Sequence, residues 1–127
     1  MSTIALTAET FDALMEKDGI VFVDFWAAWC GPCRYFAPTF EAASKKYPDI
    51  TWGKVDTDAE PALSGSLQIQ SIPTLMVFRD GILLFAQPGA LPASALDELV
   101  TQVRALDMDE VNKNVEAEEK KHSKRAG

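Results

Sequence analysis

The chain has 127 residues, with 19 acidic and 12 basic side chains and a formal net charge of −7. The length suits one domain, and 47% hydrophobic with 24% charged residues excludes a wholly disordered or collagen-like chain. The acidic balance argues against nucleic-acid binding, because phosphate contacts need a basic surface. The longest uncharged run, 61–78, carries polar residues and a proline, so we expect no membrane span.

The first twenty residues predict a helix and no export signal. Thr7 is expected to cap a helix that begins at Ala8 and ends at Gly19. No basic residue precedes Lys17, whereas a signal peptide needs a positive start and a longer apolar stretch. We therefore expect the chain in the cytoplasm.

Residues 20–26 form a nearly continuous apolar run, which is typical of a strand covered on both faces. Asp24 lies in the middle of this run. A buried carboxyl group should have a raised pKa and could take a proton from a nearby thiol. Lys54, on the strand expected alongside, is a charge partner that would moderate this shift. The alternative is an aspartate that faces solvent at a strand end or sheet edge.

Cys30 and Cys33 form a C-x-x-C between this strand and a helix predicted over 34–47, kinked at Pro38. The start of a helix favours an anion, so the Cys30 thiolate is stabilised there while Cys33, one turn in, is shielded. This placement predicts that Cys30 attacks a substrate disulfide and that Cys33 resolves the mixed disulfide.

Two alternatives apply to the cysteine pair. A structural zinc site wants four ligands, and the chain offers a single histidine, His122, in its tail. An inert pair of buried thiols is the other alternative. A purely structural disulfide between these residues would stabilise the fold little, because a four-residue ring restricts the unfolded chain only slightly.

The remaining pattern predicts a mixed sheet between helices. A strand over 50–56, a short helix over 61–67, strands over 74–78 and 82–87 joined by an Asp-Gly turn, and a last helix from Pro92 follow in order. Pro73 stands just before a strand, where base rates favour a trans bond. The fold class is therefore α/β.

Residues 107–127 differ in composition from the domain expected over 1–106. They hold six acidic and five basic residues, and their large apolar residues are Met108, Val111 and Val115. One reading is a charged, solvated tail that is disordered or a short, frayed helix. The other is an amphipathic helix that docks on a partner through these three side chains.

Five segments together resemble the thioredoxin family, with matching spacings from residue 3 to 106. They are V-D-F-W-A-A-W-C-G-P-C at 23–33, like the active-site segment; F-A-P at 36–38, like the helix kink; K-V-D at 54–56, like the central strand; I-P-T at 72–74, like the cis-proline loop; and G-A at 89–90, like the loop beside the active site. C-x-x-C alone is a weak signal, whereas five segments in register are a strong one.

The resemblance implies a thioredoxin fold, with a central mixed five-stranded sheet flanked by four helices, and a monomeric protein disulfide reductase. Cys30 is then the attacking thiolate, Cys33 the resolving thiol, and Asp24 the buried proton acceptor with Lys54 as its charge partner. No cofactor is bound: the redox-active disulfide Cys30–Cys33 is reduced by thioredoxin reductase at the expense of NADPH. The other partners are proteins that contain disulfides.

The resemblance also implies a cis bond before Pro73 and a flat surface for substrates, on which the backbone of Ile72 pairs with an extended segment. This substrate-contact surface comprises Trp29, Gly31, Pro32, Ile72, Pro73, Gly89 and Ala90, although Trp29 could equally be core packing. Ala28, Pro92 and the sequence before Gly89, which ends in Pro88, depart from the family pattern.

Two other function classes stay open. The same surface could serve a binding module in which redox chemistry is incidental. An oxidase or isomerase is disfavoured by Gly31-Pro32, since the oxidising relatives carry a histidine there that stabilises the thiolate, and by the missing export signal.

Overall fold

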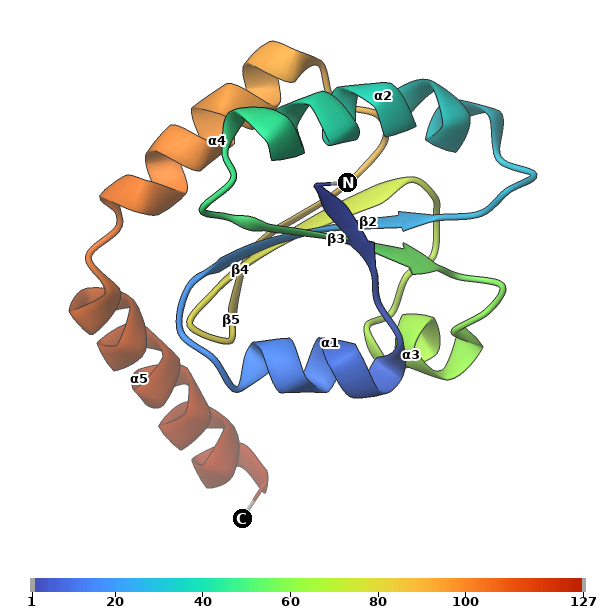
Figure 1. Cartoon of the computed structure of the whole chain (residues 1–127). Helices are drawn as coiled ribbons and strands as arrows, with labels where there is room; N and C mark the ends of the chain where they lie inside the picture. Colours follow the sequence, from blue (N-terminus) through green and yellow to red (C-terminus); the bar gives the residue numbers. More distant parts are fainter. Residues whose placement is uncertain (1, 127) are drawn as a thin grey trace.

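The computed structural model describes residues 2–126, with side-chain environments up to residue 117. Its elements are β1 (Thr3–Ala5), α1 (Ala8–Met15), β2 (Ile20–Trp26), α2 (Gly31–Lys46), β3 (Thr51–Asp56), α3 (Pro61–Ser66), β4 (Thr74–Arg79), β5 (Ile82–Pro88), α4 (Ala93–Ala105) and α5 (Met108–Ala126). Figure 1 shows α2 and α4 on one face of the sheet and α1 and α3 on the other.

The sheet confirms the expected mixed, five-stranded architecture. Its order is β1-β3-β2-β4-β5. Strands β1, β3 and β2 are parallel to one another, β4 is antiparallel to β2, and β5 is antiparallel to β4. The residue pattern did not predict β1, whose three residues pair with 52–54 of β3. The central strand β2 has a neighbour on each side, so its middle residues are shielded from solvent at both edges.

Alternation along β2 divides the core into two layers. Phe22 packs with Phe40 and Trp52 in the cluster beneath α2 and α4, whereas Val23 and Phe25 belong to the cluster beneath α1 and α3. The Phe22 and Trp52 rings are 4.5 Å apart. Because side chains alternate between faces, Asp24 falls on the same face as Phe22, the one that α2 covers.

The hairpin of β4 and β5 turns at Asp80-Gly81, as the sequence predicted. Both residues have positive φ, 54° and 77°, which the tight hairpin turn requires. A Cβ at Gly81 would collide with the backbone carbonyl oxygen of Met15. The turn therefore needs glycine for its conformation and for its close approach to α1.

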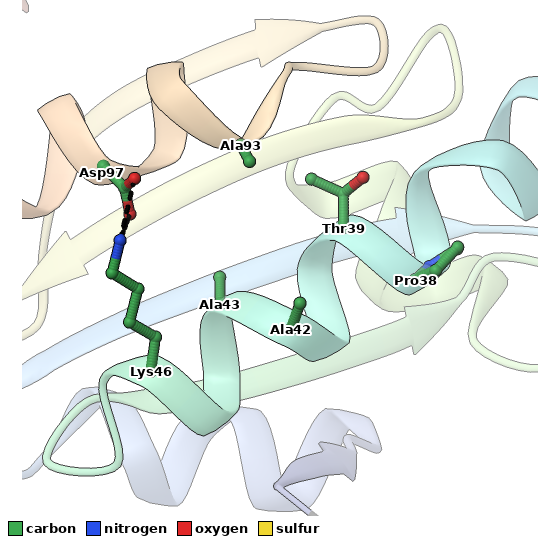
Figure 2. A pocket seen from close by; sticks show the side chains of 7 residues that line it. All are labelled: Pro38, Thr39, Ala42, Ala43, Lys46, Ala93 and Asp97. Atoms are coloured by element: carbon green, nitrogen blue, oxygen red, sulfur yellow. Dashed lines mark hydrogen bonds and ion pairs between the residues drawn. The ribbon is translucent and has the colours of Figure 1, made fainter.

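A shallow groove of about 350 Å³ runs between α2 and α4 (Figure 2). Ala42 and Ala43 of α2 line it together with residues of α4. Lys46 bridges it to Asp97, with Nζ 3.0 Å from Oδ2. The Tyr47 hydroxyl donates to Asp97 at 2.7 Å, and these two donors hold the pKa of the Asp97 carboxyl below its usual range. The groove contains neither cysteine.

Residues 2–126 contain five helices, one more than the four expected. Asp107 caps the start of α5, since its Oδ1 accepts the backbone N–H groups of Asp109 and Glu110 at 3.0 and 3.3 Å. The apolar residues Met108 and Val111 are half-buried. Within residues 2–126, none of the helices is long and apolar enough to cross a membrane.

Candidate active site

Cys30 and Cys33 form a disulfide at the amino-terminal end of α2, with Cα atoms 5.2 Å apart. Helix α2 begins at Gly31, three residues earlier than the sequence indicated, because Cys30 caps it: its Sγ accepts the backbone N–H of Cys33 at 3.1 Å. Pro32 in the first turn favours a helix start. Cys30 is 4% and Cys33 2% exposed, so both residues are largely enclosed. Negative charge on Cys30 is favoured by its position at the helix start, not by this enclosure.

Two loops close around this disulfide. The Ile72–Pro73 bond is cis, against the base rate and as the resemblance implied, and the carbonyl oxygen of Ile72 lies 3.7 Å from Cys30 Sγ. The N–H of Gly89 donates to the Pro73 carbonyl at 2.8 Å. Gly89 has φ of 102°, which residues with a side chain rarely adopt. The fold thus brings the three segments of the expected substrate-contact surface together.

The residues of that surface differ in exposure. Gly31, Pro32, Gly89 and Ala90 are exposed, whereas Ile72 is half-buried and Pro73 buried.

Trp29 is 69% exposed, which rules out core packing. Its indole N–H donates to Asp58 at 3.0 Å, a residue that sequence reasoning did not single out. A hollow of about 190 Å³ lies beside Trp29, lined also by Ile69 and Ile72. An exposed aromatic ring held in place beside a reactive disulfide is suited to contact another protein.

Asp24 is completely buried, as predicted, and the alternative of a solvent-facing position is wrong. Neither of its carboxyl oxygens has a hydrogen-bond partner among the described residues. Burial raises the pKa of Asp24 from 3.8 to about 7, and the field of Lys54 opposes part of this rise. Near neutral pH the group can therefore both accept and return a proton.

Lys54 is the register partner of Asp24 across the parallel pair of β2 and β3. Its ammonium group lies over the ring of Trp26, 5.0 Å from the centroid. The expected neighbourhood of the two charged residues is therefore present. The contact of Lys54 with Trp26 was not predicted, because it depends on the register of two strands.

No group of three or more potential metal ligands occurs within the part of the chain that the structure describes.

Comparison with known proteins adds three findings. The family model described as Thioredoxin matches residues 2–102. "Putative thioredoxin 2" of Streptomyces coelicolor is 52% identical over 114 residues, which are 90% of this chain and 85% of that protein. Thioredoxin of Bacillus subtilis is 37% identical over 103 residues, 80% of this chain and 98% of that one.

Solved structures agree with these sequence relatives. A structure of Plasmodium falciparum thioredoxin superposes with a TM-score of 0.72 and 35% identity, covering 79% of this chain and 97% of the other. Thioredoxin of Malassezia sympodialis, described as a member of a pan-allergen family, gives the same TM-score at 30% identity and covers 80% of this chain and 93% of its own.

Proposed function

Since the chain belongs to the thioredoxin family and is a protein disulfide reductase, we propose that Cys30 is the thiolate that attacks the disulfide of a substrate protein. The observation that carries this assignment is the position of Cys30 at the helix cap, where its sulfur already accepts a backbone N–H. That position stabilises negative charge on Cys30 more than on Cys33, which lies inside the first turn.

The reaction moves two electrons from the dithiol to the substrate. The Cys30 thiolate attacks one substrate sulfur, forms a mixed disulfide and releases the other sulfur as a thiolate. Cys33 then loses its proton and attacks Cys30 Sγ. This second step closes the Cys30–Cys33 disulfide and releases the remaining substrate sulfur, so one substrate disulfide becomes two thiols.

Asp24 accepts the proton of Cys33 in the second step, directly or through a water. Its place on the face of the sheet beneath α2 supports this role, as does the absence of a competing hydrogen-bond partner among the described residues. A pKa of about 7 matches a group that must gain and lose a proton at neutral pH. The positive charge of Lys54 lowers the pKa of Asp24 and so limits the rise that burial causes.

Substrates bind across the surface of Trp29, Gly31, Pro32, Ile72, Pro73, Gly89 and Ala90. The backbone of Ile72 pairs with an extended substrate segment, like one rung of a sheet. Since Pro73 is buried, it fixes the backbone conformation next to Ile72 without touching the substrate. The exposed residues of this surface make the direct contacts.

Thioredoxin reductase regenerates the dithiol with electrons from NADPH. This recycling needs a reducing compartment, which supports a cytoplasmic location. We assign the reductase activity to a monomeric domain over 1–106 and treat 107–127 as a separate, charged extension.

Insulin reduction, coupled to NADPH oxidation by a thioredoxin reductase, tests the proposal. Cys30→Ser should abolish turnover, and Cys33→Ser should accumulate mixed disulfides that a reductant releases. Ala28→Ser, an exposed neighbour that adds the same hydroxyl group, serves as the control and should turn over normally. Undiminished turnover by either cysteine variant would refute the assignment.

A further inference from the structure

Lys54 lies within reach of two side chains of β2 that compete for its ammonium group. Asp24 is its register partner, and Trp26, two residues further along β2, projects from the same face of the strand. Lys54 Nζ is 5.0 Å from the centroid of the Trp26 ring. Among the residues the structure describes, no ion pair joins it to Asp24. The ammonium group therefore sits over the ring and not on the carboxyl group.

The ring of Trp26 contacts Lys54 through its face. Its Nε1 is buried and has no acceptor in the described part of the chain, whereas Nε1 of Trp52 donates to the carbonyl of Tyr47 at 3.0 Å. A cation above an indole face is attracted by the negative charge of the π-system, most strongly where water is excluded. Trp26 thus offers Lys54 a partner that competes with the carboxylate.

Lys54 is the charged group whose field reaches Asp24. On the opposite side, β4 presents the apolar Leu75 to Asp24. Asp56, which lies on the same face of β3 as Lys54, accepts backbone N–H groups of the following loop. On α2, Glu41 is bonded to Thr3 of β1, and the helix start contributes the cysteine pair.

We propose that Trp26 is a positioning residue for the proton transfer: its ring holds the Lys54 ammonium group away from Asp24. The carboxyl group then keeps its affinity for a proton at neutral pH, because its nearest cation is engaged elsewhere. This inference rests on the role proposed above for Asp24. It makes the tryptophan a means of setting the pH at which the resolving step is fastest.

A double-mutant cycle tests the proposal. The Asp24 carboxyl carbon is followed by NMR against pH in the oxidised full chain, in the wild type, Trp26→Leu, Lys54→Met and the double variant. Trp26→Leu should lower the midpoint by about one pH unit, because the freed ammonium group pairs with the carboxylate. In the Lys54→Met background, Trp26→Leu should leave the Asp24 midpoint unchanged. Trp26→Phe keeps an aromatic face, so its Asp24 midpoint should stay close to that of the wild type.

A second readout follows the reaction itself. The pH profile of insulin reduction by Trp26→Leu should move to lower pH in step with the Asp24 midpoint. An equal change of the midpoint with and without Lys54 would overturn the inference, since Trp26 would then only exclude water.

The wild type provides a test that needs no variant to fold. The methylene protons next to Lys54 Nζ should show the upfield displacement that an aromatic face produces, and ordinary lysine positions would also overturn the inference. If Asp24→Asn turned insulin over at the normal rate while the NMR cycle behaved as expected, the catalytic role of Asp24 would fail and the positioning by Trp26 would stand.

Discussion

Asp24→Asn should stabilise the folded protein, and the gain should grow with pH. The pKa of Asp24 is about 7 in the fold against an ordinary 3.8. Because the folded value is raised, the folded chain retains a proton that the unfolded chain releases, so this group lowers the stability as pH rises through that interval. Above the interval the penalty is on the order of 4 kcal/mol, at 1.36 kcal/mol per pH unit. An asparagine carries no charge at any pH and removes the penalty.

Urea unfolding of the oxidised protein measures this effect at about pH 4 and about pH 8. The free energy of unfolding of Asp24→Asn should match the wild type at the lower pH and exceed it by about 3–4 kcal/mol at the higher. Asp12→Asn, an exposed aspartate on α1, is the matched control and should show no such difference between the two pH values. A constant difference for Asp24→Asn at both pH values, or a less stable variant at the higher one, would refute the reasoning.

Four further changes probe the fold. Phe40→Ala should cost about 3–5 kcal/mol in urea unfolding, because the ring is fully buried between α2 and the sheet; a loss below about 1 kcal/mol would contradict this packing. Gly81→Ala should cost more than about 1 kcal/mol, since φ is 77° and the added carbon meets backbone. Gly65→Ala, in open space on a helix, should instead stabilise by about 0.5–1 kcal/mol. Arg79→Met should speed hydrogen exchange at the end of α4, because Nη1 donates to the Val103 carbonyl at 2.7 Å; unchanged exchange would show that this bond contributes little.

Much of the fold could be predicted because local patterns and tertiary structure agree. The apolar run over 20–26 marks a strand covered on both faces, and a carboxyl group inside such a run has no route to solvent. Asp80-Gly81 allows the positive φ values that a hairpin turn needs, so it fixes where β4 ends. Thr7 caps α1 because its side chain accepts the backbone N–H of Thr10, the third residue of the helix, and this is a purely local interaction.

Other features depend on contacts between distant segments, and the residue pattern could not supply them. Strand β1 is three residues long and forms only by pairing with β3. The cis bond before Pro73 is rare for such peptides, and the resemblance to a family was needed to expect it. The contact of Trp29 with Asp58 joins residues 29 positions apart. The length of α5 stayed open because its charged composition suits a helix and a solvated coil equally well.

The enclosure of Cys30 has a consequence for the proteins that it reduces. Only 4% of Cys30, the residue proposed as nucleophile, is exposed, and the Ile72 carbonyl oxygen lies 3.7 Å from its sulfur. A backbone hydrogen bond from the N–H of Gly89 to the Pro73 carbonyl at 2.8 Å joins the two loops beside it. We therefore expect a disulfide on an exposed, extended segment of a target protein to be reduced faster than one buried in its interior.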